Sequence, residues 1–346
     1  MSAYICQMYL LVERYVETFV EISPYIELLI CIPCIVINIY CAIRFANLQT
    51  FNNNFRIIMI VTNFICAGVS LLHGFMSIVP RQYLSLENEY YKAVAFYTVA
   101  YIHHWCVLML DIKFFILGFE RWFGFRSRAT YEHSEDNTSI KIYCSLAVLA
   151  FCAVTTKVYL YLTFNDKSNE TFRRAFVVED DLSAMLASHL LALFGWIYAF
   201  VIFRRLMRQA EAFRFSSQSL SESYVIKETI RINTVIGPIV RAYLVMAIAC
   251  TMTLAFNIYC MQYGYWEMRS AYYQSLTNVE YIMINTYNFY ASSYTIWYLR
   301  PLRKIFLNDL RTVFKCSIQM ENGVSPVDRL EDAATVHFDH LHSQWQ

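Results

Sequence analysis

Ionisable side chains are rare in the long apolar stretches of this 346-residue chain, and they are its first candidates for chemistry. His104 and Asp111 are seven residues apart, which places both on one face of a helix, whereas His103 points to another face. Glu280 lies about two turns inside a second apolar stretch. Because a charge in an apolar environment is costly, each of these residues needs a polar partner or a function.

A candidate aromatic pocket surrounds Glu280, formed by residues that lie at a similar depth in their stretches. Its predicted lining is Tyr97, Tyr101, His104, Trp105, Tyr273, Glu280, Tyr281 and Asn285. The alternative is that His104 and Glu280 only form hydrogen bonds between helices. No acid, nucleophile or third ligand is placed beside His103 and His104, so we predict no catalytic residue, no metal site and no cofactor.

A second candidate site is the pair Glu120-Arg121, where the longest apolar run changes abruptly to a charged block. An acid–arginine pair at the end of a helix can act as a switch, because the arginine is held while paired and meets a partner when released. The alternative is an arginine that only reaches phosphate headgroups beside an unrelated acid.

The elements that position these residues follow from the composition. The chain is 58% hydrophobic and 16% charged, whereas a soluble domain has about a quarter charged residues. This composition argues against an ordinary soluble domain and predicts an all-α polytopic membrane protein. The formal net charge of +1 argues neither for nor against a nucleic-acid partner, and we expect none for a membrane protein of this kind. Lys113, Lys157 and Arg241 lie near the ends of their stretches, where their charges are expected to reach the membrane surface.

Seven apolar stretches are long enough to cross a membrane, which takes about 20 residues. They predict a seven-helix bundle at 24–299, with spans at about 24–45, 57–79, 92–119, 142–164, 182–203, 237–261 and 272–299. Residues 1–23 are expected to form an extracellular N-terminal segment, and residues 317–346 a cytosolic tail.

Basic residues predict the orientation of the bundle. One set of loops holds 17 Lys and Arg residues and the opposite set holds 7, which places the N-terminus outside and the C-terminus in the cytosol. Asn169 begins a glycosylation sequon in a loop assigned to the outside, so we expect it to be modified. Asn137 begins another sequon on the cytosolic side and should stay unmodified.

Residues 300–316 are predicted to form an amphipathic helix after the last span. Leu302, Ile305, Phe306 and Leu310 recur at helical spacing with basic residues between them, so the helix is expected to lie on membrane lipid. Cys316 follows at once and is a candidate for palmitoylation.

Three segments resemble the class epsilon (Sre) family of nematode serpentine chemoreceptors. They are FERWFGF with RATYE after the third span, TIWYLRPLRKIF after the seventh, and the terminal HFDHLHSQW. The resemblance covers nearly the whole chain, and it gives Glu120 and Arg121 the place of the acid–arginine pair on the G-protein side. Span seven lacks an Asn-Pro-x-x-Tyr pattern, and Cys6 and Cys260 are the only candidates for a bridge near the outer face.

The resemblance implies a chemosensory receptor that binds an external small molecule and signals to a heterotrimeric G protein. Such a receptor is not an enzyme, and it lies in the plasma membrane, for this family in the sensory cilium of chemosensory neurons. The alternative is a seven-span transporter or ligand-gated channel. A transporter is expected to show paired repeats and helices broken by Gly or Pro, which the sequence does not show.

Overall fold

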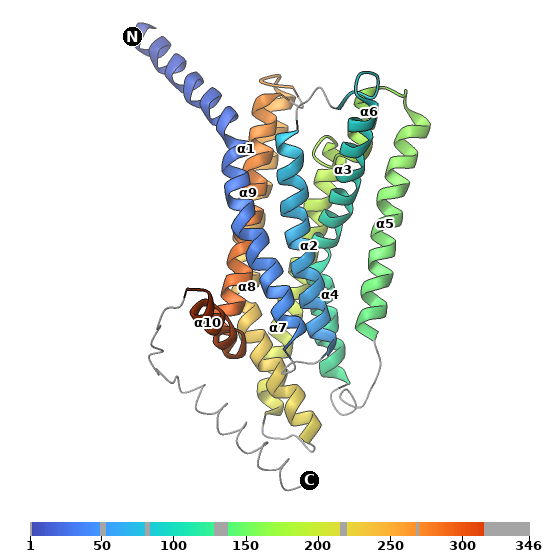
Figure 1. Ribbon diagram of the computed structural model, residues 1–346, viewed down its shortest axis with the longest axis vertical. Helices are drawn as coiled ribbons and strands as arrows, with labels where there is room; N and C mark the ends of the chain where they lie inside the picture. The colour runs from blue at the N-terminus through green and yellow to red at the C-terminus, as the bar shows by residue number, and fades with distance from the viewer. Residues whose placement is uncertain are drawn as a thin grey trace. The chain divides into compact units, whose positions relative to one another are not determined.

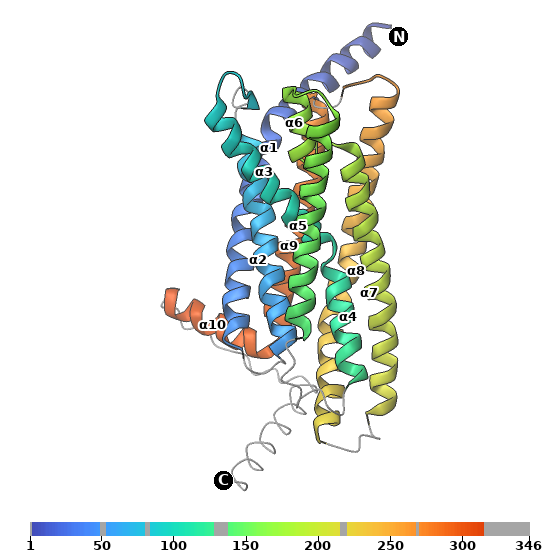
Figure 2. The same ribbon diagram turned by 90° about the vertical axis from the view of Figure 1, so that its right-hand side faces the viewer.

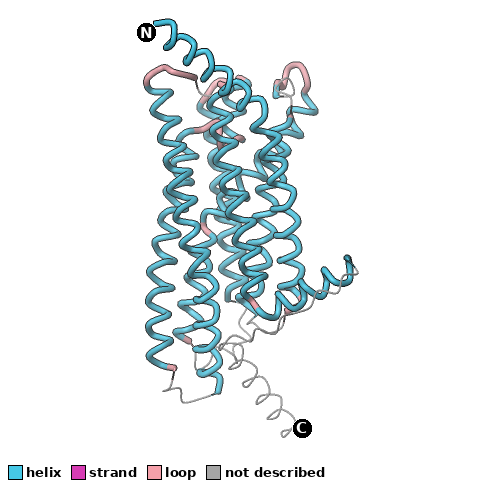
Figure 3. Tube along the Cα trace, turned by 90° about the vertical axis from the view of Figure 1, so that its left-hand side faces the viewer, coloured by secondary structure: helices cyan, strands magenta, loops and turns pink. Residues whose placement is uncertain are grey.

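The computed structural model describes residues 2–48, 53–79, 84–127, 138–214, 220–267 and 270–314. The predictions for Asn137, Cys316 and the tail at 317–346 lie outside these residues, as does the side chain of Cys6. All regular secondary structure in the described residues is helical, as Figure 3 shows. This confirms the all-α prediction.

Ten helices account for most of the described residues (Figure 1). They are α1 (Ser2–Ala46), α2 (Asn53–Ile78), α3 (Tyr90–Asp111), α4 (Lys113–Arg126), α5 (Thr138–Phe164), α6 (Asn169–Phe176), α7 (Leu182–Phe213), α8 (Leu220–Gln262), α9 (Ala271–Tyr298) and α10 (Arg300–Phe314). The chain divides into two compact units, Met1–Leu302 and Arg303–Gln346. The first unit holds α1 to α9. In the second, α10 places Ile305, Phe306 and Leu310 among basic residues at helical spacing.

Six helices are long and apolar enough to cross a membrane. The crossing segments are Glu17–Ala46, Asn53–Ile78, Tyr90–Asp111, Ile140–Phe164, Leu182–Phe213 and Glu222–Gln262. Backbone N–H and C=O groups have no water to bond inside lipid, so helices that satisfy their own backbone are the structures that such sequences form. The predicted N-terminal segment and first span form one helix, which continues through Pro24 and Pro33.

The helix expected as the seventh span, α9, is not among these six because one of its faces is polar. Asn278, Asn285, Asn288, Ser292 and Thr295 recur at steps of three, four or seven residues, and all are buried. Asn278 donates to the Ser23 hydroxyl at 3.1 Å, and Asn285 accepts from the Ser70 hydroxyl at 2.7 Å. The polar face is thus bonded to α1 and α2, while α9 has 28 residues, enough for a span.

Within the first unit the helices pack side by side (Figures 1 and 2). The helix α9 packs against α1, α2 and α8, and α7 packs against α8, α3 and α4. The helix α5 contacts α2, α3 and α6, and its other face exposes large apolar residues such as Val148, Leu149 and Tyr159. An exposed apolar face of this size fits a surface that meets lipid.

The third predicted span is broken into α3 and α4 at Ile112, whose φ is −84° and ψ is −3°. Gly195 of α7 lies against the break: a Cβ added there would meet the Phe115 ring at 3.0 Å and the Asp111 carbonyl oxygen at 3.3 Å. The missing side chain therefore lets α7 approach the break closely.

A short segment at 177–181 joins α6 to α7 and turns into one end of the bundle. We call it the lid, and the end at which it lies the lid end; the opposite end is the Arg121 end (Figure 1). All five lid residues are buried. Ser168 caps α6 by accepting from the Thr171 N–H, and Asp181 caps α7 by accepting from the Ser183 N–H at 3.1 Å.

Candidate functional site

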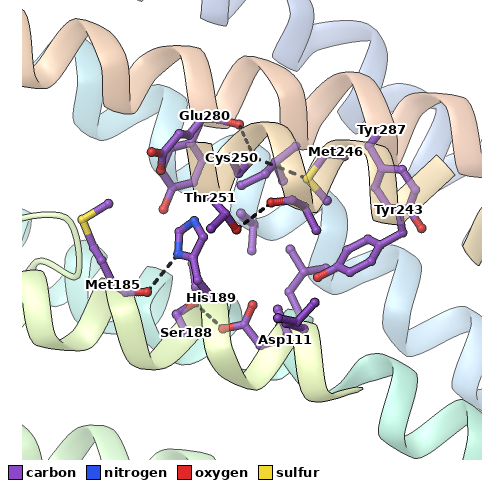
Figure 4. A pocket seen from close by; sticks show the side chains of 18 of the residues that line it. Asp111, Met185, Ser188, His189, Tyr243, Met246, Cys250, Thr251, Glu280 and Tyr287 are labelled. Carbon is purple, nitrogen blue, oxygen red and sulfur yellow. Dashed lines mark hydrogen bonds between the residues drawn. The ribbon is translucent and has the colours of Figure 1, made fainter. Parts of the chain in front are cut away.

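A cavity of about 90 Å³ lies between α3, α4, α7, α8, α9 and the lid, and we call it the central cavity. Its walls are mostly apolar or aromatic. Its ionisable lining residues come from six segments and include Asp111, Lys113, Glu179, His189, Tyr243, Glu280, Tyr281 and Tyr287. Figure 4 shows several of them, with Asp111, His189, Tyr243, Glu280 and Tyr287 labelled. A mostly apolar cavity with a few convergent polar groups is the usual form of a small-molecule site.

Asp111, at the break between α3 and α4, faces α7 across this cavity. Its Oδ2 accepts from the Ser188 hydroxyl at 2.5 Å, and its side chain is buried. On the next residue of α7, His189 donates through Nδ1 to the Met185 carbonyl at 2.9 Å. Asp111 is therefore bonded to α7 inside the bundle.

Lys113 is buried at 8% exposure instead of reaching the membrane surface. Its Nζ lies 5.3 Å, 5.4 Å and 5.0 Å from the ring centroids of Phe114, Tyr243 and Tyr287. Aromatic faces attract a cation by their quadrupole, which accounts for a buried ammonium at this position.

The lid brings Glu179 to the cavity. Its Oε1 accepts from the Tyr281 hydroxyl at 2.5 Å, and its backbone carbonyl accepts from the Tyr273 hydroxyl at 2.7 Å. Two imidazoles lie near the same carboxylate oxygen: His73 Nε2 at 3.8 Å and His103 Nδ1 at 3.6 Å. The carboxylate thus joins the lid to α2, α3 and α9.

The acidic residues that follow in the lid bind other elements. Asp180 accepts from Arg173 Nε at 2.8 Å, and Asp181 Oδ2 lies 3.1 Å from Lys157 Nζ. Burial would raise the pKa of Asp181, but the Ser183 hydroxyl and the Lys157 ammonium outweigh burial and lower it below its usual value. The sequence predicted that the charge of Lys157 reaches the membrane surface, whereas in the structure Lys157 is held by Asp181 of the lid.

Beyond Glu179 lies a buried chain of polar contacts toward α1. His73 Nδ1 lies 2.5 Å from Glu27 Oε1, and the Ser77 hydroxyl donates to Glu27 Oε2 at 3.0 Å. The Tyr281 ring stacks on His73 with 3.3 Å between centroids. The sequence analysis missed Glu27, His73 and Glu179. An acid inside the first apolar stretch was the signal that could have found the first of them.

Two carboxylate oxygens at the cavity are buried and have no hydrogen-bond partner among the described residues: Glu179 Oε2 and Glu280 Oε1. Both residues line the cavity. The exposed fraction is 7% for Glu179 and 3% for Glu280.

The residues predicted to form one pocket are distributed over several places. Glu280 and Tyr281 line the central cavity, and Tyr273 lies beneath the lid. The other side chains take part in separate contacts: Tyr97 donates to Leu84, Tyr101 bonds Thr155, Trp105 donates to Ala147, Asn285 bonds Ser70, and His104 is buried outside the cavity lining. His103, expected to point elsewhere, is the histidine of this pair that approaches Glu179.

At the Arg121 end, the predicted acid–arginine pair forms. Arg121 donates through Nε and Nη2 to the two carboxylate oxygens of Glu120, and both side chains are 3% exposed. Arg121 Nη1 also lies 3.9 Å from Glu228 Oε2 of α8, and the guanidinium carbon lies 5.0 Å from the Phe55 ring centroid of α2. One guanidinium therefore touches three helices. Glu228 was not predicted.

A second cavity of about 80 Å³ lies between the two sites. It shares Lys113, Tyr287 and Asn288 with the central cavity. Its other polar residues include Asn38, Asn63 and Ser292, and the Ser292 hydroxyl lies 2.8 Å and 2.9 Å from the two amide oxygens. Polar side chains therefore continue from the central cavity toward the Arg121 end.

Comparison with known proteins adds a family. The family model described as serpentine type 7TM GPCR receptor class ab chemoreceptor matches residues 5–317. The matching class is ab, whereas the quoted motifs resembled class epsilon. Two of those motifs are short aromatic and basic segments at span ends, a pattern that many membrane helices need, and the third is a short segment of the C-terminal tail. No curated protein sequence matches the chain.

Proposed function

This chain belongs to the family of serpentine class ab chemoreceptors, and from that premise we propose that it binds a small external molecule and signals to a heterotrimeric G protein. The family and the apolar helices make it a multi-pass membrane protein of the receptor type. In the proposed arrangement α9 is the seventh span, the lid end faces outward, and the protein lies in the plasma membrane.

The orientation is supported by the basic residues and by the position of Asn169. Asn169 is the first residue of α6 at the lid end, the end that the smaller number of basic residues assigns to the outside. The Arg121 end would then face the G protein, with the connection at 204–231 beside it. The helix α10 would lie on the lipid of the inner leaflet.

The observation that carries the proposal is the position of Arg121. Its guanidinium is held by Glu120 on its own helix and lies near Glu228 of α8. A partner that inserted between α4 and α8 would compete for this arginine. Ligand binding at the central cavity, whose walls include both helices, would favour the state in which the arginine is released.

The proposal is tested by signalling of Arg121 variants at matched surface expression. Arg121→Ala should abolish signalling while the ligand still binds. Arg121→Lys should also fail, because a compact ammonium cannot make the planar, two-pronged hydrogen bonds that the released guanidinium makes with the partner. Arg44→Ala, which removes another cation from the same end of the bundle, should signal normally.

Acid variants test the resting state. A charge-assisted bond contributes about 1.5–3 kcal/mol, so Glu120→Gln should raise basal signalling roughly tenfold or more. Glu228→Gln should raise it less, because 3.9 Å is longer than a hydrogen bond. Full signalling by Arg121→Lys would instead mean that only a cation near phosphate is needed. A ligand-gated current in the absence of G protein would favour the channel alternative.

A further inference from the structure

We propose that the central cavity binds a small organic cation, a primary ammonium whose charge lies between the carboxylates of Glu179 and Glu280. This inference rests on the proposed function, because it states the chemical class of the receptor's ligand. It begins from the two carboxylate oxygens, Glu179 Oε2 and Glu280 Oε1, that are buried and have no hydrogen-bond partner among the described residues.

An unpaired buried carboxylate is expensive, since the charge loses its hydration and gains nothing in exchange. Here two such oxygens come from different elements, the lid and α9, and line the same cavity. A hydrogen-bond donor placed between them would satisfy both. A primary ammonium has three N–H donors and a positive charge, so it can bond both oxygens and offset both charges.

The cations nearest in the fold are already engaged. Lys157 pairs with Asp181 at 3.1 Å, and Arg173 bonds Asp180 at 2.8 Å. Lys113 has its ammonium among three aromatic rings. The imidazoles of His73 and His103 approach Oε1 of Glu179, the oxygen that Tyr281 already bonds.

The charges that face the cavity also favour a cation. Asp111, Glu179 and Glu280 line it, against the single ammonium of Lys113. Asp111 already accepts from Ser188, so the two unpartnered oxygens are those of the glutamates. An anionic ligand would lie beside three acidic side chains, and a ligand without hydrogen-bond donors would leave the two glutamate oxygens unbonded.

The walls indicate that the cation is organic. The lining is mostly apolar, and it includes three tyrosine rings and two thioethers, those of Tyr243, Tyr281, Tyr287, Met185 and Met246. Aromatic ring faces and thioethers bind hydrocarbon and an organic ammonium better than they bind a hydrated ion. The described residues contain no group of three or more His, Cys, Asp or Glu side chains arranged to hold a metal ion.

The test is direct binding to the purified full-length receptor, measured as a shift in Tm without any G protein. The probes are the straight-chain primary amines from ethylamine to hexylamine, each beside the alcohol and the carboxylate of the same chain length. We expect at least one amine to raise the Tm in a saturable way, while its matched alcohol and carboxylate do not. If no amine does so, or if the alcohol does so equally, the proposal is wrong.

Variants locate the bound charge. Glu280→Gln and Glu179→Gln, which keep the shape of the side chain, should each weaken amine binding by roughly tenfold or more. Glu89→Gln removes an acid at the lid end whose side chain is 41% exposed, and should leave the affinity unchanged. Unchanged amine affinity in Glu280→Gln and in Glu179→Gln would overturn the proposal. If one of the two variants fails to fold, unchanged affinity in the other is enough to overturn it.

The outcomes for ligand class and for receptor function can be told apart. An amine that binds but elicits no signal at any concentration would leave the cavity assignment standing and count against the proposed function. A neutral odorant that signals through Arg121, with no amine bound, would do the reverse. A Tm that rises in Glu280→Gln while amines have no effect on the unsubstituted receptor would show that this buried acid destabilises the fold and takes no amine, which also overturns the proposal.

Discussion

Single residues in this protein are constrained above all by the cost of burying charge. Glu27, which is fully buried, illustrates this cost: its carboxylate is held by His73 and Ser77. The contact links α1 to α2, and the stacking of Tyr281 on His73 extends it to α9. A buried acid with two close partners is tolerated where an isolated one is not.

His73→Leu should therefore destabilise the receptor strongly. It leaves the Glu27 carboxylate with Ser77 alone, and breaking a buried pair costs about 3–5 kcal/mol. Glu27→Leu should cost less, because the remaining imidazole can lose its proton. The double variant should be more stable than the sum of the two losses predicts, since no unpaired charge remains. Thermal unfolding in detergent measures all three. Strict additivity would show that the two side chains do not depend on each other.

Part of the residue-scale picture could be read from sequence. Glu120 and Arg121 are adjacent in the chain, so their pairing was predictable, and Glu280 stood out as an acid in an apolar stretch. Glu228 and Glu179 could not be assigned, because each contact joins residues about a hundred positions apart and depends on how the helices pack. Sequence shows that a buried charge needs a partner, and only packing shows which one.

At the scale of elements, the break between α3 and α4 depends on a residue of another helix. Position 112 holds Ile and not Pro or Gly, so the local sequence does not predict a break in the helix there. The absent side chain of Gly195 provides the space in which the Phe115 ring and the Asp111 carbonyl lie. The break in turn places Asp111 and Lys113, two positions apart, at the same cavity.

Gly195→Ala should lower the stability of the receptor by about 1–3 kcal/mol, because the new methyl group meets Phe115 at 3.0 Å and overpacks the contact. Gly237→Ala is the matched control. Its added Cβ has nothing within 4 Å, so the helix propensity of alanine should leave stability equal or higher. The measurement is the Tm of each purified variant. Equal behaviour of the two substitutions would remove the role assigned to Gly195.

Length and average hydropathy mark six helices as able to cross a membrane, and α9 is not among them although the sequence predicts a seventh span at 272–299. The inward face of α9 carries amides and hydroxyls, which lower its average hydropathy although they are bonded to α1 and α2. Average hydropathy counts every face of a helix equally, whereas in a bundle one face meets other helices and can be polar. The length of the segment and the spacing of its polar residues identify it more reliably than hydropathy.

For the whole molecule, the family and the all-helical fold agree with what composition indicated, while the lid was not foreseen. The segment at 177–181 lies between two predicted spans, where an exposed loop is the usual expectation, yet its residues are buried. Acidic residues usually mark exposed loops. Here each acid has a basic or hydroxyl partner on another helix, which no local pattern reveals.

Topology is the prediction on which the receptor proposal depends. With the lid end outside, Asn169 should carry a glycan in cells and Asn137 should not. Removal of glycans should increase the mobility of the unsubstituted protein on a gel, and Asn169→Gln should abolish that change while Asn137→Gln preserves it. A glycan on Asn137 would place the Arg121 end outside and overturn the proposed coupling.

The contacts of the lid also determine how the lid end of the bundle responds to reductants and to acid. Nine cysteines are free among the described residues, and the lid is held by the contacts of three consecutive acids to α5, α6 and α9. The lid should therefore stay closed in a reducing medium. Acid should have a different effect, because folding lowers the pKa of Asp181. The stability that this carboxylate contributes is complete above the usual aspartate pKa and is lost as the pH falls through the lowered pKa. A segment held by charged side chains, and not by a disulfide bond, should be insensitive to reductants and should be released in strong acid.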